Sequence, residues 1–196
     1  MIILTLLISA VSFGQTSQEY FNSGYDKAAA KDYYGAISDY TKAIELDPNY
    51  ADAYYNRGLS KKRLKDYYGS ISDYNKSIEL DPNYADAFLN RGNSKHNLKD
   101  YYGAISDYNK SIEVDPNSAN VYFNRGNSKN KLKDYYGAIV DFNKAIELDP
   151  NNAKAYSGRG ISKELIGDLT GACADWKKAA SLGDTDSAKW VANQCN

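Results

Sequence analysis

Small and apolar side chains recur at steps of three and four residues along most of the chain, which is the period of an α-helix. Residues 51–84 show this pattern twice, first in ADAYYNRGLSKKRL and then in DYYGSISDYNKSIELDPN. Asp66 stands before the second run, where its carboxylate can accept a hydrogen bond from a free backbone N–H group of the first helical turn. Pro82 follows that run and prevents its continuation. The segment is therefore predicted to form two helices joined by a short turn.

The two-helix pattern repeats with a period of 34 residues. Four Asp-Pro pairs mark the period, at Asp47-Pro48, Asp81-Pro82, Asp115-Pro116 and Asp149-Pro150. The units run over residues 17–50, 51–84, 85–118, 119–152 and 153–186, and the second and third are identical at 26 of 34 positions. The fifth unit departs from the pattern by ending in Leu182-Gly183-Asp184. Self-similarity of this kind is typical of solenoids, in which each unit packs mainly against its neighbours.

Residues 17–186 resemble the tetratricopeptide repeat family. The second unit carries the family's preferred residue types at Tyr54, Gly58, Tyr67, Ile71, Tyr74, Ile78 and Pro82. The resemblance implies an all-α fold, a right-handed superhelix of antiparallel helix pairs with a C-terminal capping helix. It also implies a concave groove lined mainly by the first helix of each unit, and a protein or peptide as partner.

Charged residues replace the family's usual residues at regular places. The first helices carry Arg57, Arg91, Arg125 and Arg159, and four residues later Lys61, Lys95, Lys129 and Lys163, with Lys27 in the first unit. The second helices carry Asp39, Asp73, Asp107, Asp141 and Asp175. Arg and Lys four residues apart share one helix face. We expect a partly buried ladder of ion pairs between neighbouring helices, the alternative being solvated charges on a convex face.

One stripe of the first helices is a candidate peptide-binding groove. Places two, five, six, nine and thirteen of a unit are separated by steps of three or four residues, so they share one helix face. The family resemblance implies that this face lines the groove. The candidate residues on this stripe are Phe21, Asn22, Tyr55, Asn56, Leu89, Asn90, Asn93, Phe123, Asn124 and Asn127. Asparagine amides both donate and accept hydrogen bonds, which suits the backbone of an extended peptide. The alternative is that they bond only neighbouring helix ends or water.

The sequence predicts no charge preference for the ligand. Some members of the resembled family capture acidic peptide C-termini with a clamp of Lys, Asn and Arg, and Asn93, Asn124 and Lys154 match part of it. Leu89 and Gly158 stand where two of its cations belong, which argues against carboxylate capture. Both signs of charge occur near the stripe, in Asp52, Asp86, Lys62, Arg63 and Lys131.

Composition disfavours other classes of function. The formal net charge is −1, whereas nucleic-acid binding requires a basic excess, so no nucleic-acid partner is expected. His96 is the one histidine, and the sequence shows no nucleophile-and-base set, metal-ligand spacing or phosphate loop. We therefore expect neither enzymatic activity nor a cofactor. The sequence favours a protein–protein interaction module that binds an extended peptide, with a structural spacer in an envelope assembly as the alternative.

The two ends of the chain carry separate signals. MIILTLLISAVSFG at residues 1–14 is apolar but too short for a stable membrane span, and residues 1–16 are interpreted as a signal peptide without the usual positive start. A buried first helix is the alternative. Export to the periplasm or secretion would permit a disulfide between Cys173 and Cys195, against two free thiols. Such a bond would fasten a C-terminal cap, residues 187–196. We expect the covering helix to be formed by residues 185–194 and to pack through Ala188, Trp190 and Val191.

Overall fold

A computed structural model describes residues 15–195 and is helical throughout its regular elements. The expected signal peptide therefore lies almost wholly outside the described residues. The helices are α1 (Ser17–Ala29), α2 (Tyr33–Leu46), α3 (Ala51–Arg63), α4 (Tyr67–Leu80), α5 (Ala85–Asn97), α6 (Tyr101–Val114), α7 (Ala119–Lys131), α8 (Tyr135–Leu148), α9 (Ala153–Leu165), α10 (Leu169–Ser181) and α11 (Thr185–Gln194). Each 34-residue unit forms one helix pair, so the predicted all-α solenoid is confirmed.

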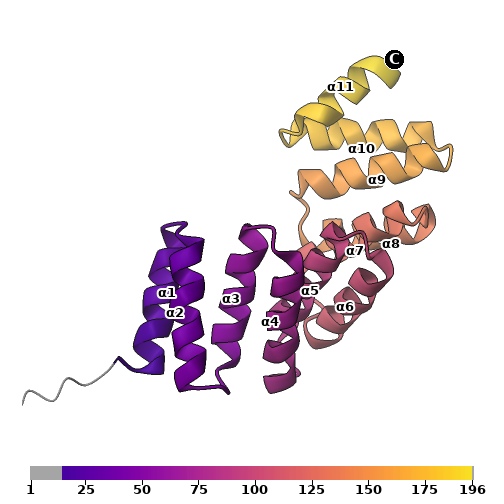
Figure 1. Cartoon of the computed structure of the whole chain (residues 1–196). Coiled ribbons are helices and arrows are strands. Elements are labelled where there is room, and N and C mark those ends of the chain that lie inside the picture. The colour runs from indigo at the N-terminus through magenta and orange to yellow at the C-terminus, as the bar shows by residue number, and fades with distance from the viewer. Residues whose placement is uncertain (1–14, 196) are drawn as a thin grey trace, which may run out of the picture.

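The helix pairs stack in chain order. Within a unit the first helix packs along the second, and each second helix packs against the first helix of the following unit. The first helices α1, α3, α5, α7 and α9 also contact one another in succession, which places them together on the inner side of the stack. Figure 1 shows the helix axes turning steadily from the first units to the last, so the stack winds into a superhelix.

Short polar turns end and restart the helices within each unit. In the second unit, Lys65 adopts a left-handed conformation with φ of 64°, and the Asp66 N–H donates to the Lys61 carbonyl at 2.9 Å. This arrangement closes the C-terminus of α3 as a Schellman motif does. The Asp66 carboxylate then accepts from the Gly69 N–H at 2.9 Å and caps α4. The capping role predicted for Asp66 is confirmed, and the equivalent residues cap the second helix of every other unit, namely Asp32, Asp100, Asp134 and Asp168.

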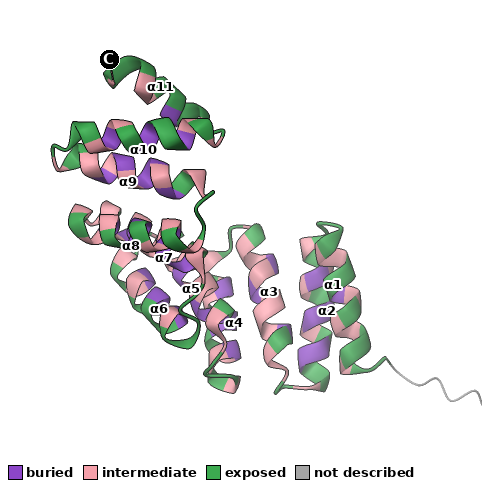
Figure 2. Ribbon diagram, turned by 180° about the vertical axis from the view of Figure 1, so that it is seen from behind, coloured by how far each residue is buried: buried purple, intermediate pink, exposed green. Residues whose placement is uncertain are grey.

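The core is a column of aromatic rings packed on glycines. Each second helix contributes one fully buried ring, from Tyr40, Tyr74, Tyr108, Phe142 and Trp176. The Tyr108 ring lies so close to α5 that a Cβ atom on Gly92 would sit 2.7 Å from it. Glycine is therefore required at this helix crossing. Figure 2 shows the buried positions gathered where helices face each other, whereas exposed residues follow the outer surfaces and turns.

The predicted ladder of ion pairs is present and buried. Asp73 has a side-chain exposure of only 4% and accepts Arg57 Nη2 at 2.7 Å and Lys61 Nζ at 2.8 Å. Arg57 Nε donates to its second oxygen at 3.0 Å, which makes the contact bidentate. Equivalent triads join Arg91 and Lys95 to Asp107, Arg125 and Lys129 to Asp141, and Arg159 and Lys163 to Asp175.

Each ladder arginine also links its unit to the one before. Arg91 Nη1 donates to Asn75 Oδ1 on α4 at 2.7 Å, and the same bond recurs from Arg125 to Asn109 and from Arg159 to Asn143. The first unit has Ser23 in place of the arginine. Burial alone would raise the pKa of Asp39, but hydrogen bonds from Lys27 and Ser23 outweigh this and leave the pKa below its usual value. The ladder therefore connects repeats as well as the helices within them.

Helix α11 covers the end of the stack. The Trp190 ring lies 5.3 Å from that of Trp176 on α10, and Ser187 is buried with its hydroxyl bonded to Ser157. The prediction for Ala188 is wrong, because Ala188 is exposed and Ser187 takes the inner position. Asp184 caps the helix at the Ser187 N–H and fixes this register.

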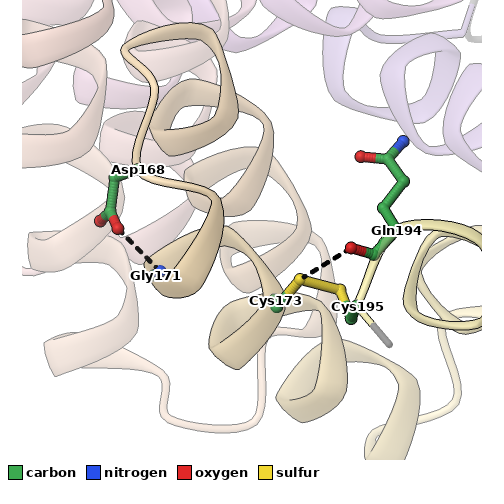
Figure 3. Close-up of a disulfide and its surroundings, with 5 residues drawn as sticks. All are labelled: Asp168, Gly171, Cys173, Gln194 and Cys195. Atoms are coloured by element: carbon green, nitrogen blue, oxygen red, sulfur yellow. Dashed lines mark hydrogen bonds between the residues drawn. A yellow bond between two sulfur atoms is a disulfide. The ribbon is translucent and has the colours of Figure 1, made fainter.

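A disulfide fastens α11 to the preceding helix. Cys173 on α10 is bonded to Cys195, which directly follows α11, across a Cα–Cα distance of 5.6 Å. Figure 3 shows the bond beside Gln194, whose carbonyl oxygen lies 3.9 Å from the Cys173 sulfur. Between residues 15 and 195, no helix has the length and apolar character needed to cross a bilayer.

Candidate functional site

Three hollows lie in series on the inner face of the superhelix. The front hollow, of about 250 Å³, lies between the first two units. The central hollow, of about 450 Å³, spans units two to four, and the rear hollow, of about 300 Å³, spans units three to five. Arg63 lines both the front and central hollows, while His96 and Asn127 line both the central and rear ones. The hollows therefore follow one another along a groove on the inner face, and their lining comes mainly from the first helices.

The central hollow is polar and positively charged. Its cations are Lys62 and Arg63, at the end of α3, and Lys65 in the following turn. Four amides, two tyrosines and the histidine complete the lining, namely Asn93, Asn97, Asn124, Asn127, Tyr67, Tyr108 and His96. No Asp or Glu is among the described residues that line it. This part of the groove thus offers cations and amides without any carboxylate of its own.

Lys62 is partly buried without a carboxylate partner. Its Nζ donates to Asn90 Oδ1, whereas the next-door Lys61 contacts the ladder residue Asp73. Asn90 is held in turn, because its Nδ2 donates to the Asp86 carbonyl at 2.9 Å and to Tyr55 Oη at 3.0 Å. Burial, and to a smaller extent the charge of Arg63, lower the pKa of Lys62 to about 8. Lys62 is therefore a cation that the fold accommodates at a cost.

His96 stands where the central and rear hollows meet. Its Nδ1 lies 2.7 Å from the Ser128 hydroxyl on α7, and its ring meets Tyr101 edge to face at 5.2 Å. Burial and then the charge of Lys131 lower the pKa of His96 below its usual value. At neutral pH the imidazole is therefore uncharged and serves as a hydrogen-bonding group.

Some of the asparagines predicted to line the groove do line its hollows, and others do not. Asn56 lines the front hollow, and Asn93, Asn124 and Asn127 line the central one. Asn22 and Asn90 line none of the three hollows. Asn56 Nδ2 also donates to the Asp52 carbonyl of its own helix at 2.8 Å.

The predicted apolar members of the stripe pack between helices rather than line the hollows. The Phe21 ring stacks on Tyr50 at 4.9 Å, and the Tyr55 ring lies 4.7 Å from Tyr84. Phe123 meets the Phe142 ring at 6.0 Å. Leu89 packs against the buried cluster that includes Tyr108 and Val121. These side chains therefore pack between neighbouring helices, and most of the lining comes from places nine to thirteen.

Lys62 and Arg63 line the groove but are not among the predicted groove residues, although place thirteen, which Arg63 occupies, belongs to the predicted stripe. They occupy the twelfth and thirteenth places of the second unit, where the third unit has His96 and Asn97 and the fourth has Asn130 and Lys131. The available sequence signal is variation among units that otherwise match at most positions. Places nine, twelve and thirteen, whose residue types vary along the chain, supply much of the lining of the hollows.

Replacing Lys62 with Met is expected to stabilise the protein. A folded-state pKa near 8 against about 10.5 in the unfolded chain means that the charged form is disfavoured by folding, by about 2 kcal/mol after allowance for solvent screening. Since the unfolded chain binds more protons between pH 8 and 10.5, stability of the natural protein should rise through that window. The gain in Lys62→Met should be full below pH 8 and disappear by about pH 10.5. Urea unfolding of both proteins across this range measures it, and a loss of stability at pH 7 would contradict the burial cost.

The described residues hold no group of three or more His, Cys, Asp or Glu side chains suited to binding a metal ion. Gly158, Arg159 and Gly160 lie inside α9 rather than in a loop. The chemistry that the groove displays is hydrogen bonding and positive charge. These are properties of a recognition surface.

Comparison with known proteins agrees with this architecture. The sequence profile of the tetratricopeptide repeat matches residues 51–84, 85–118 and 119–152, and a related profile, described as a TPR repeat, matches residues 24–65. Among curated proteins no sequence matches the chain.

Several solved structures share the fold. A crystal structure of MamA protein is 24% identical, with a TM-score of 0.79 over 89% of this chain and 94% of that one. MamA of Desulfovibrio magneticus RS-1 is 20% identical, with a TM-score of 0.81 over 88% of this chain and 99% of that one. YrrB, described as a TPR protein with an unusual peptide-binding site, is 21% identical, with a TM-score of 0.77 over 90% and 92%. With a profile match over more than half of its length and helix pairs in every unit, the chain belongs to the tetratricopeptide repeat family.

Proposed function

We propose that this protein is a non-enzymatic interaction module that holds an extended segment of another protein in its inner groove. The observation that carries the proposal is the succession of three hollows along the inner face, in which Arg63 lines the first two and His96 and Asn127 line the last two. An extended peptide needs a long channel rather than one closed pocket. It also needs donors and acceptors along its length, which Asn93, Asn124 and Asn127 supply.

The family and the shared fold support this proposal. Tetratricopeptide repeats generally serve as interaction modules, and the YrrB structure is described as having a peptide-binding site. The inner helices are held rigidly by the ion-pair ladder, so the groove is formed before a ligand arrives. A preformed groove lowers the ordering cost of binding.

Peptide selection followed by mapping tests the proposal. A dodecapeptide bound by the immobilised protein is selected from a random library, and its binding is mapped by amide chemical-shift changes. We expect the shifts to follow α3, α5 and α7. The double variant Asn124→Ala and Asn127→Ala should weaken binding of that peptide about tenfold, as the loss of one or two hydrogen bonds predicts. Asn117→Ala, at an exposed turn, is the matched control.

Asn124 and Asn127 are better test positions than Asn90. Replacing Asn90 would also release Lys62 and Tyr55 from their hydrogen bonds, so a loss of binding would have two causes. Shift changes confined to α2, α4, α6 and α8 would instead favour the spacer function with an outer-face contact. They would overturn groove binding.

We also propose that the protein is exported. The supporting observations are the apolar segment at residues 1–14 and the Cys173–Cys195 bond, because disulfides persist in oxidising compartments. Fractionation of cells with N-terminal sequencing of the mature chain tests this. A full-length protein retained with reduced thiols in the cytosol would contradict export.

A further inference from the structure

We infer that the central hollow binds the carboxylate of an acidic side chain carried by the extended peptide, with Lys62 as its main ionic partner. This inference rests on the proposed function and adds the ligand's chemistry. It assigns an ionic subsite formed by α3, the turn after it, α5 and α7. The subsite differs from a terminal-carboxylate clamp, because it is built around the twelfth place of the second unit and accepts a side chain within the peptide.

The central hollow has an imbalance of charge, with cations and no carboxylate in its lining. Four lysines at place eleven each contact a ladder aspartate at 2.8 Å, namely Lys61, Lys95, Lys129 and Lys163. Lys62 instead has the neutral oxygen of Asn90 as its partner, and Arg63 and Lys65 add positive charge at the same hollow. A partly buried cation without a counter-ion is costly, and a carboxylate brought by a ligand would remove that cost.

The amide side chain of Asn93 has a fixed orientation in the central hollow. The Tyr108 hydroxyl donates to Asn93 Oδ1 at 2.9 Å, which fixes the amide so that its Nδ2 group is left to donate elsewhere. Asn93 therefore presents donors to the hollow, as an anion requires. Asn124 and Asn127 bring both donors and acceptors on α7. A peptide backbone both donates and accepts hydrogen bonds, so it can bond to both kinds of group. The oxygens of an ionised phosphate accept hydrogen bonds and are recognised by donors on the protein.

Apolar and charged side chains follow one another in a definite order along the groove. The front hollow is lined by Tyr25, Ala28, Ala29, Tyr33 and Leu59, together with polar groups. The rear hollow has Ile161 and Leu165 beside Asn130 and Lys131. Apolar surface thus stands on both sides of the cationic centre. The groove fits a peptide with an acidic residue between two apolar ones.

Several charged or titratable groups face this subsite and set its pH dependence. Arg63 and Lys65 come from the end of α3 and its turn, Tyr67 from α4, His96 from α5 and Tyr108 from α6, while Lys131 of α7 acts on His96. Lys62, whose pKa burial lowers to about 8, is the group that the bound carboxylate would contact directly. A bound carboxylate favours the ammonium form and would raise its pKa, so binding above pH 8 should take up a proton.

Three peptide pools test the inference. The pools are randomised dodecapeptides that differ only at a fixed central residue, which is Glu, Gln or Lys. On the immobilised full-length mature protein we expect the Glu pool to be retained about tenfold better than the Gln pool, and the Lys pool least. Lys62→Met should remove the preference for Glu over Gln, and Lys62→Arg should keep most of it. Lys110→Met, on the exposed side of α6, should change nothing.

The outcomes separate this inference from the proposed function. Equal retention of the Glu and Gln pools would overturn the acidic subsite and leave peptide binding standing, whereas retention of no pool would overturn both. Tighter binding of inorganic phosphate than of the Glu pool would replace the peptide carboxylate by a phosphate ligand. A second readout is the pKa of Lys62 Nζ followed by NMR with the Glu pool present. A rise from the free value supports the ion pair, and an unchanged pKa contradicts it.

Discussion

Replacing Asp73 with Ala is expected to lower the free energy of unfolding by about 3 kcal/mol, the loss usual when one partner of a buried ion pair is removed. Asp73 is almost fully buried and receives three hydrogen bonds from two cations. Without it, Arg57 and Lys61 lie partly buried with no counter-charge. Arg57 would still be held by Thr41 of the preceding unit and so could not swing freely into water. Urea unfolding at neutral pH measures the loss.

Glu79→Ala on the same helix is the matched control. Glu79 pairs with Lys76 at 2.6 Å, but its side chain is 67% exposed, and exposed pairs of this kind contribute about 0.3–0.5 kcal/mol. The two variants remove the same kind of charge from α4 and differ in burial. If Asp73→Ala lowered the free energy of unfolding no more than Glu79→Ala does, the ladder would not be a stabilising connection between helices and repeats.

The sequence predicts the repeat architecture well because the causes are local. Helix period, the Asp66 cap and the Pro82 stop act within a few residues of chain, and each recurs in register. The ladder is predictable for a related reason. Arg57 and Lys61 share a helix face, and the second helix of every unit carries an aspartate at the same place, which can pair with the cations of the first helix.

The groove is less predictable because its lining depends on how far each side chain reaches across neighbouring units. Asn90 and Asn124 occupy the same place in their units, yet Asn90 is held by Tyr55 and Lys62, while Asn124 lines the central hollow. That difference follows from Tyr55 and Lys62 in the second unit, which have no equivalents in the third. Likewise a helical wheel alone places Ala188 inward, and the Asp184 cap instead sets a register with Ser187 inside. A contact across units decides the first position, and a local helix cap decides the second.

The ladder and the groove divide the first helices between two tasks. Places seven and eleven, as in Arg57 and Lys61, face the second helix and carry almost the same residues in every unit. Place twelve faces the groove and varies from Lys62 to His96 to Asn130. Conserving one face fixes the superhelix, and this leaves the other face free to differ from unit to unit. A regular scaffold can thus carry an irregular recognition surface.

The double variant Cys173→Ala and Cys195→Ala is expected to release α11 while the rest of the solenoid stays folded. The bond joins residues 22 apart in sequence, and a loop of that length contributes roughly 3 kcal/mol in the chain-entropy model. Helix α11 contacts chiefly α10, through Trp190 and Trp176, so little else would hold the cap closed. Amide hydrogen exchange measures the change. Protection of α11 should fall by about two orders of magnitude.

Helix α1, at the far end of the stack, provides an internal reference whose protection should not change, because units in a solenoid interact with their neighbours only. Adding a reductant to the natural protein should reproduce the effect of the double variant on α11. Opening of α11 would expose the fully buried Trp176, so its fluorescence should shift towards that of a solvated indole. Unchanged protection of α11 in the double variant would show that the tryptophan contact and the Ser187–Ser157 bond hold the cap without the disulfide.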